Sequence, residues 1–317
     1  MLRGDRLARL DAALAFLGER LRHDHPLGPS TTYRVGGPAR RLVEVAGADE
    51  LVRIAAALAG TVGADADDVV VVGKGSNLLV ADRGVDALVL QLGEGFAEID
   101  VRGEVIRAGG AVSLPVLARR SVAAGLEGFE WAVGVPGSVG GAVRMNAGGH
   151  GSDMAATLAG VRVVDLASGE DLEMDPASLQ LGYRSSSLRG AQVVVHADLQ
   201  LRPGDREAGE SLISEIVRWR REHQPGGQNA GSVFTNPPGD SAGRLIDAAG
   251  AKGLRIGTAQ VSDKHANFIQ ADVDGSADDV RSLMVEVQRR VREHSGVELH
   301  PETVMAGFDD ALDGSAP

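Results

Sequence analysis

A glycine-rich turn directly after an apolar run is the first segment of this sequence that is equipped to bind phosphate. Four valines at 69–72 precede Gly73-Lys74-Gly75-Ser76-Asn77, and Leu78 follows. Glycines let backbone amides approach a pyrophosphate closely, and serine and asparagine side chains add donors. The turn therefore predicts contacts between residues 73–78 and a nucleotide. A plain hairpin turn would explain the same residues, because short glycine motifs occur in many proteins.

Two familiar nucleotide-binding motifs do not fit this turn. A Walker loop needs Gly-Lys followed by Ser or Thr, whereas Lys74 is followed by Gly75. A Rossmann turn needs a third glycine where Leu78 stands and a helix after it, whereas residues 78–80 have the composition of a strand. A dinucleotide at this turn would therefore lie on a fold of another type.

A second glycine-rich stretch lies between residues 125 and 153. It contains Gly-Val-Pro-Gly-Ser-Val-Gly-Gly at 134–141 and Asn-Ala-Gly-Gly-His-Gly at 146–151. We expect no regular element here, and a loop of this length inside a compact domain is usually functional. Two such loops in one domain can hold a long ligand from both sides. The candidate contacts are Gly134, Pro136, Gly137, Ser138, Gly140, Gly141, Asn146, Ala147 and Gly148.

Hydrophobic periodicity predicts the elements that must position these loops. Helices are expected at 7–22, 50–58, 114–124, 211–222, 244–249 and 276–295, and strands at 69–72, 78–80, 87–92, 104–108, 161–166, 193–201 and 267–271. Alternating polar residues from His196 to Gln200 predict one wet face for their strand. Ser276 and Asp279 are expected to cap the last helix, and Gly296 to end it. The mixture indicates an α+β fold.

The domain organisation is read from composition. Pro203-Gly204-Asp205 marks a change in composition and a plausible linker. We therefore expect one region at 1–203 and a second domain at 204–308. Subdomains at about 1–85 and 86–203 are also expected within the first region, although composition does not mark their boundary. Residues 309–317 form an acidic tail that is expected to be disordered.

Composition excludes several classes of protein and site. The net charge of −12 argues against a nucleic-acid binder. The absence of cysteine excludes disulfides and cysteine-bound zinc or iron–sulfur clusters. His23 and His25 lack further ligands nearby, so no metal site is expected. No stretch approaches the roughly 20 apolar residues of a membrane span, and the N-terminus lacks signal-peptide features, so we expect a cytoplasmic protein without membrane contact.

Seven motifs, in order from about residue 27 to 308, give the chain a resemblance to a known family. The chain resembles the UDP-N-acetylenolpyruvoylglucosamine reductases, of the shorter type that lacks an extra tyrosine-bearing loop. The motifs are Thr32-Tyr33-Arg34-Val35-Gly36-Gly37, Gly73–Leu79, Gly134–Gly141 with Asn146-Ala147-Gly148, Gly182-Tyr183-Arg184-Ser185-Ser186, Ala230-Gly231-Ser232-Val233-Phe234-Thr235-Asn236-Pro237, Lys264-His265-Ala266-Asn267-Phe268 and Pro301-Glu302.

The resemblance implies a fold and an activity. The part up to about residue 203 would be an FAD-binding domain of the vanillyl-alcohol-oxidase type, and the remainder an α+β substrate-binding domain. FAD would be bound non-covalently, with His150 an ordinary loop residue. NADPH would reduce the FAD, leave, and be replaced by a UDP-sugar whose enolpyruvyl ether is reduced for peptidoglycan synthesis. We expect a monomer.

The resemblance also assigns roles to residues. Arg184 would bind and polarise the substrate carboxylate, Ser232 would donate a proton, and Glu302 would help to polarise the enolpyruvyl group or relay the proton. Tyr33 joins the glycine loops among the cofactor contacts. Substrate contacts are expected from Tyr183, Gln224, Asn236 and Lys264. The cation that neutralises the diphosphate stays open among Arg220, Arg221 and Lys264.

Two other functions remain open. Another FAD-dependent oxidase or dehydrogenase of the same fold would keep the glycine loops but need not keep Arg184, Ser232 and Glu302 in these contexts. A non-catalytic binding protein would be expected to have lost one of those three positions, and all three are present.

Overall fold

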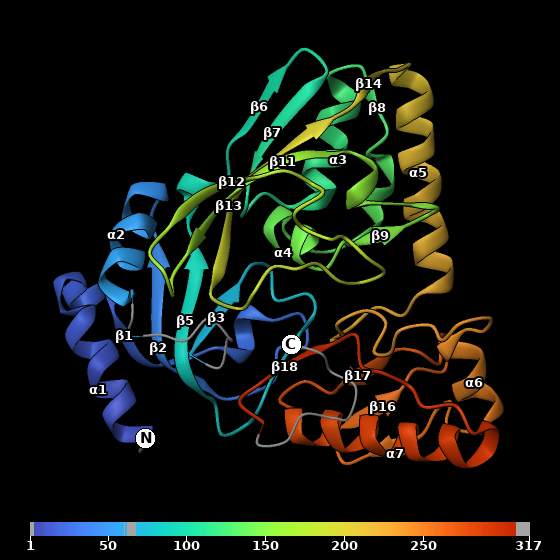
Figure 1. The fold of residues 1–317 in the computed structure, drawn as a ribbon. Coiled ribbons are helices and arrows are strands. Elements are labelled where there is room, and N and C mark those ends of the chain that lie inside the picture. Colours follow the sequence, from blue (N-terminus) through green and yellow to red (C-terminus); the bar gives the residue numbers. More distant parts are fainter. Residues whose placement is uncertain (1–2, 60, 62–67, 309–317) are drawn as a thin grey trace.

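In the computed structural model, which describes residues 3–59, 61 and 68–308, the chain begins with a four-stranded sheet (Figure 1). Its order is β1 (Arg22–Pro26), β2 (Pro38–Val45), β5 (Val85–Leu92) and β3 (Val69–Val72), with only the β1–β2 pair antiparallel. Helices α1 (Arg3–Ala13) and α2 (Ala48–Leu58) cover it, and leucines from both helices share one core with valines and leucines of the strands. The predicted strand at 69–72 is confirmed. The expected tail at 309–317 lies outside the described residues.

The helix expected at 7–22 is only partly correct. The α-helix ends at Ala13, and a 3₁₀ helix covers Ala15–Arg20 with Gly18 at a φ of +57°. Leu10, Leu14, Leu17 and Leu21 are nevertheless all buried, as the apolar stripe predicted. The spacing identified the buried face but not the glycine that interrupts the helix.

A second, antiparallel sheet of five strands packs with the second glycine-rich stretch. Its order is β12 (Asp171–Met174), β11 (Leu158–Asp165), β13 (Gln192–Gln200), β7 (Val105–Gly109) and β6 (Ile99–Arg102). One face packs against α3 (Leu114–Ala123), α4 (Val139–Arg144) and α5 (Arg206–His223). The polar positions of β13 lie on the other face, where Asp198 accepts two hydrogen bonds of 2.7 Å from Arg107, so the predicted wet face is confirmed.

The expectation of no regular element between 125 and 153 is wrong. The segment contains β8 (Leu126–Glu127), a 3₁₀ helix (Glu130–Gly134), α4, and a hairpin of β9 (Gly148–Gly149) and β10 (Ser152–Asp153). Ser138 caps α4 by accepting the amide of Gly141 at 3.5 Å. Gly140 packs so tightly that an added Cβ would lie 3.2 Å from the carbonyl oxygen of Gly110. Tertiary packing thus selects glycine inside a helix, where propensity alone disfavours it.

The C-terminal region is a small α+β unit. A three-stranded sheet, β15 (Arg255–Ile256), β16 (Ala259–Val261) and β17 (Ile269–Ala271), packs against α6 (Ala242–Ala248) and α7 (Ala277–Ser295). The apolar stripe of α7 is fully buried, and Gly296 ends the helix at a φ of +72°. Helix α5 leads into this unit after β14 (Arg202–Pro203), yet its buried face belongs to the core of the second sheet.

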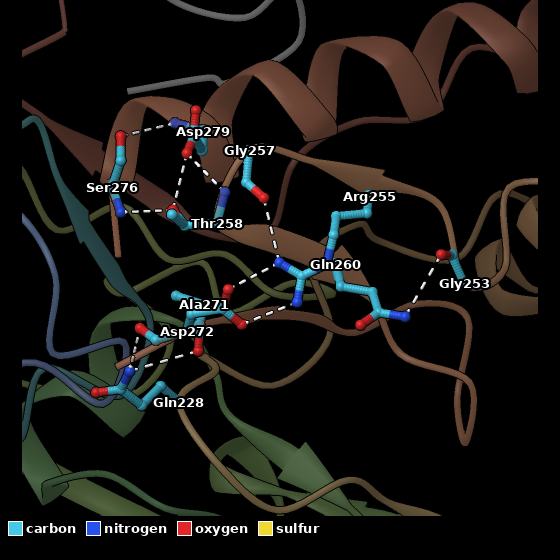
Figure 2. A network of polar contacts seen from close by, with 10 residues as sticks. All are labelled: Gln228, Gly253, Arg255, Gly257, Thr258, Gln260, Ala271, Asp272, Ser276 and Asp279. Carbon is cyan, nitrogen blue, oxygen red and sulfur yellow. Dashed lines mark hydrogen bonds and ion pairs between the residues drawn. The ribbon is translucent and has the colours of Figure 1, made fainter. Parts of the chain in front are cut away.

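The cap of α7 differs from the expected reciprocal pair. Ser276 Oγ accepts the amide of Asp279 at 3.1 Å, as expected. The Asp279 carboxylate instead accepts the amide and the hydroxyl of Thr258, both at 2.8 Å, and the Thr258 hydroxyl accepts the amide of Ser276 (Figure 2). A residue distant in sequence has replaced half of the local capping box.

The end of the chain returns to the first glycine-rich turn. Strand β18 (Val304–Ala306) pairs in parallel with β4 (Leu78–Val80), which directly follows that turn. Tyr33 and Leu79 are buried in the same core as α6 and α7. These contacts bring the C-terminal unit against the loops that were predicted to bind a nucleotide. No helix among the described residues has the length and apolar character that crossing a membrane requires.

Candidate active site

The two glycine-rich turns meet in the fold. A Cβ on Gly73 would lie 2.2 Å from the Oγ of Ser138, and one on Gly137 would lie 3.2 Å from the Oγ of Ser76. Each glycine thus lies directly against a serine side chain of the other turn. Segments about 60 residues apart in sequence therefore form one polar wall, as expected of loops that hold a ligand from both sides.

Local geometry makes this wall suitable for a diphosphate. Gly75 has a φ of +58°, and its carbonyl accepts the amide of Thr32 at 3.1 Å, which fixes the turn. The amides of Ser76, Gly137 and Ser138 donate to no acceptor within the described part of the chain. Unused amides beside glycine are the donor set that phosphate oxygens require. These residues therefore fit the diphosphate of a dinucleotide.

Arg184 and Glu302 form an ion pair beside that wall. Their Nε and Oε1 atoms are 2.9 Å apart, although the Nε–H does not point along a good hydrogen bond. Arg184 Nη2 also donates to the carbonyl of Gly148 at 3.0 Å. Burial raises the pKa of the Glu302 carboxyl above its ordinary value, and Arg184 only partly opposes this shift. A partly buried arginine next to a carboxyl whose pKa is raised can bind an anion and take part in proton transfer.

Ser232 lies next to this pair through backbone pairing. The amide of Glu302 donates to the carbonyl of Val233 at 2.7 Å, so the segment containing Ser232 runs alongside Glu302. Asn77 Nδ2 donates to the carbonyl of Glu302 at 2.9 Å, and the amide of Val304 donates to the carbonyl of Asn77 at 3.0 Å. The structure therefore joins the side chains of Arg184 and Glu302 and places Ser232 one residue from a backbone contact of Glu302, next to the first glycine turn.

A polar cavity of about 350 Å³ is lined by Ser232 and by residues between 236 and 267 of the C-terminal unit. Three cations, Arg244, Lys252 and Lys264, line it together with Asp247. Arg244 pairs with Asp240, whereas Lys252 is 3.5 Å from Asp247. The other lining residues are Asn236, Ser241, Gly243, His265, Ala266 and Asn267. A cationic cavity is notable in a chain of net charge −12, and it suits an anionic ligand.

Sequence reasoning did not single out Lys252 or Arg244. Lys252 stands between Gly250 and Gly253, both at positive φ. A lysine flanked by glycines was the one sequence feature that could have marked Lys252 as a candidate for anion binding. Of the other predicted substrate contacts, Asn236 and Lys264 line the cavity, and Lys264 Nζ also donates to the carbonyl of Arg221 at 2.5 Å.

Tyr183 and Gln224 are placed differently from one another. Tyr183 is exposed, with the Arg184 guanidinium 5.4 Å from its ring centre. Gln224 ends α5, and its buried Oε1 has no partner among the described residues. Both stay candidate substrate contacts.

Tyr33 is packed in the interior. Its side chain has no exposed surface, its hydroxyl has no partner among the described residues, and burial raises the pKa of that hydroxyl. A hydroxyl that solvent does not reach is also shielded from a ligand, so its visible role is packing between the N-terminal turn and the C-terminal core. Its expected cofactor contact stays a prediction.

Arg220 is a half-buried cation without an acidic partner in the described part of the chain. Its stem packs beside Gly134 and His150, and burial lowers its pKa. Arg220 also holds the pKa of His150 below its ordinary value, after the larger effect of burial. Arg221 is exposed. Among the described residues no cluster of three or more His, Asp or Glu side chains is arranged to hold a metal ion.

Comparison with known proteins decides the family. A model of the UDP-N-acetylenolpyruvoylglucosamine reductase C-terminal domain matches residues 223–306, and a model of an FAD binding domain matches residues 39–175. The chain is 45% identical to UDP-N-acetylenolpyruvoylglucosamine reductase 2 of Symbiobacterium thermophilum, over 92% of this chain and 93% of that one. It is 40% identical to the reductase of Rubrobacter xylanophilus, over 94% and 99% of the two chains.

The chain belongs to the UDP-N-acetylenolpyruvoylglucosamine reductase family.

The fold of this reductase agrees with the assignment. The crystal structure of the Thermus caldophilus reductase matches it with a TM-score of 0.77 and 38% identity, over 90% of this chain and 99% of that one. The predicted fold class is confirmed: an FAD-binding domain of the vanillyl-alcohol-oxidase type and a C-terminal α+β domain. The reductase is an FAD-dependent oxidoreductase, and the residues of its two glycine turns fit that cofactor.

Proposed function

We propose that this chain is a UDP-N-acetylmuramate dehydrogenase. NADPH reduces its FAD, and the enzyme then reduces the enolpyruvyl ether of UDP-N-acetylglucosamine enolpyruvate to UDP-N-acetylmuramate for peptidoglycan synthesis. The observation that carries the proposal is the Arg184–Glu302 ion pair, which lies beside Ser232 and is joined to the cofactor turn through Asn77. Bound FAD supplies hydride chemistry, and the protein supplies binding, orientation and protons.

Arg184 is proposed to bind the carboxylate of the enolpyruvyl group. Nη2 is held by the carbonyl of Gly148, which leaves Nη1 to reach a ligand. Hydride addition at the vinyl carbon places negative charge on the neighbouring carbon and its carboxylate. A fixed guanidinium in a partly buried site stabilises that developing charge more strongly than it would in water.

Ser232 is proposed to deliver the proton to that carbon. A hydroxyl is a weak acid, so it donates only once negative charge has developed on the substrate and only with help from its neighbours. Glu302 is suited to help, because its pKa is raised and its backbone runs alongside the segment that contains Ser232. Glu302 is accordingly assigned the polarising or relaying role.

The cationic cavity is proposed to take the diphosphate of the UDP-sugar. It begins at Ser232, so a substrate whose enolpyruvyl group faces Arg184 can extend its nucleotide into the cavity. Lys264 and Lys252 are the cations proposed to neutralise the diphosphate, with Asn236 as a further contact.

We also propose that the protein is a monomer and that it lies in the cytoplasm. Residues 1–203 are proposed to form the FAD-binding region and residues 204–308 the substrate domain.

An anaerobic half-reaction experiment tests the function. Purified protein is expected to be yellow, to bleach on addition of NADPH, and to regain its colour on addition of the enolpyruvyl UDP-sugar. Bleaching without recovery would favour another FAD-dependent oxidase or dehydrogenase. Colourless protein that takes up no FAD would favour a non-catalytic binding protein.

A further inference from the structure

Arg184 occupies a backbone conformation that other contacts must maintain. Its φ is +55°, in the left-handed region that side chains other than glycine rarely adopt. It lies in a tight turn in which the amide of Gly182 donates to the carbonyl of Ser185 at 3.0 Å. A left-handed residue costs roughly 1–2 kcal/mol, so the turn needs support from outside its own four residues.

Asn146 supplies one such support. It is 4% exposed, and its Nδ2 donates to the carbonyl of Gly182 at 2.9 Å and to Asp153 Oδ2 at 3.2 Å. Its Oδ1 accepts the amide of Ala155 at 3.0 Å. The Oδ1 end of the carboxamide faces a backbone N–H, and the Nδ2 end faces two acceptors. These partners fix the orientation of the Asn146 carboxamide. The side chain of Asn146 is thus fully engaged with the protein, and the carbonyl that it holds belongs to Gly182, two residues before Arg184.

Further bonds join the same two segments on the other side of Arg184. Ser186 Oγ donates to the carbonyl of Arg144 at 2.7 Å. The Arg144 guanidinium donates to the carbonyl of Leu188 at 3.2 Å, that of Arg189 at 2.8 Å and that of Gln192. Arg184 itself donates to the carbonyl of Gly148. Residues 144–148 and 182–192 are therefore linked from both directions, and we call residues 144–148 the clamp segment.

The clamp segment also connects to the cofactor turn. It follows α4, whose first turn is capped by Ser138, and Ser138 lies against Gly73 in the other glycine-rich turn. One short helix therefore separates the proposed diphosphate wall from the side chain that holds Gly182. The clamp segment thus links Arg184 to the first glycine-rich turn.

We propose that Asn146 is a positioning residue for Arg184, which acts by holding the carbonyl of Gly182 and thereby the left-handed turn that aims the guanidinium at the substrate carboxylate. The inference rests on the proposed function, because it gives Arg184 its task. It assigns the Asn146 side chain to the arginine turn, whereas the sequence suggested a contact with the cofactor.

A double-mutant cycle with Arg184→Lys tests the proposal on the FAD-loaded enzyme. Misplacing a catalytic group by about 1 Å can cost about 100-fold in rate, so Asn146→Ala is expected to slow reoxidation of reduced FAD by the enolpyruvyl UDP-sugar by about 10- to 100-fold. Reduction of FAD by NADPH is expected to stay within about twofold of wild type, because that step does not use the substrate carboxylate. With Arg184→Lys already present, Asn146→Ala is expected to add less than about threefold, since both changes act through one interaction.

A second variant and a control keep the result interpretable. Asn146→Asp preserves the size of the side chain and the acceptor for Ala155 but replaces the donor that faces Gly182, so the same loss is expected if Asn146→Ala does not fold. Asp279→Ala serves as the control, because it removes part-buried polar contacts to Thr258 at 2.8 Å in a network that includes neither Arg184 nor its partners Glu302 and Gly148 (Figure 2). It is expected to lower the free energy of unfolding without changing either half-reaction.

Several outcomes would overturn the proposal. Independent, multiplying losses from Asn146→Ala and Arg184→Lys would refute the positioning role alone. Loss of FAD from a folded Asn146→Ala protein would assign Asn146 to the cofactor instead. Wild-type turnover in Arg184→Lys by itself would refute the proposed role of Arg184, and with it the proposed function of the site.

Discussion

Asp82 is predicted to fasten the C-terminal unit to the FAD-binding region. Its carboxylate, which follows β4, accepts Ser276 Oγ at 2.6 Å, the amide of Ala277 at 3.0 Å and the amide of Asp278 at 3.2 Å. These donors form the first turn of α7, almost 200 residues further along the chain. Asp82→Ala would leave two helix amides without their acceptor and remove a negative charge from the positive end of the helix dipole.

The expected loss follows from these contacts. Removing a capping acceptor costs about 0.5–2 kcal/mol, and removing a favourable charge at a helix N-terminus costs about 0.3–1 kcal/mol. Ser276 continues to cap Asp279, and Asp82 is exposed, so we expect about 1–2 kcal/mol in total. Asp82→Asn keeps only one of the two oxygens that accept these hydrogen bonds, so its cost should exceed the charge component of about 0.3–1 kcal/mol and approach that of Asp82→Ala.

Urea unfolding of the FAD-loaded protein measures this loss. Flavin fluorescence reports opening of the cofactor site, and far-UV circular dichroism reports loss of helix. Asp100→Ala is the control, because it removes an exposed partner of Arg102 that should contribute little. If Asp82→Ala unfolded within about 0.5 kcal/mol of wild type, like an ordinary surface substitution, the fastening role would be refuted.

Three further predictions concern the site itself. Ser232→Ala should leave FAD reduction by NADPH unchanged and slow reoxidation by substrate by about 100-fold or more, as stopped-flow absorbance would show; equal effects on both steps would contradict the donor role. Gly75→Ala should weaken FAD binding by about tenfold, because it places a Cβ 2.3 Å from the carbonyl oxygen of Ser30 at a φ of +58°. An unchanged Kd for FAD in a fluorescence titration would show that this turn does not bind the cofactor. Burial raises the pKa of Glu302 above 4.5, so its carboxylate opposes folding once ionised; relative to Glu302→Gln, the wild-type free energy of unfolding should fall as pH rises through the folded-state pKa, and parallel curves from about pH 4 to about pH 8 would exclude this effect.

Much of the local structure was predictable from the sequence. The valines at 69–72 form a buried strand, the apolar stripe of α7 is buried, and Gly296 ends that helix, because each depends on side-chain spacing or on backbone freedom within a few residues. The same local reasoning was wrong at α4, where two glycines enter a helix and a Cβ on Gly140 would lie 3.2 Å from the carbonyl oxygen of Gly110. It also gave Asp279 a local partner, whereas Thr258 takes that place.

The sequence by itself determined the motifs and their order, and through them the family resemblance and the residue types available for chemistry. Only the tertiary structure decided which of these residues meet. Pairing of β4 with β18 places Asn77 against the backbone carbonyl of Glu302, and the turn at 182–185 brings Arg184 to the carboxylate of the same residue. The reason is physical: propensity and capping act between near neighbours in sequence, whereas the partners of a side chain 30 to 225 residues away depend on how whole sheets and helices pack.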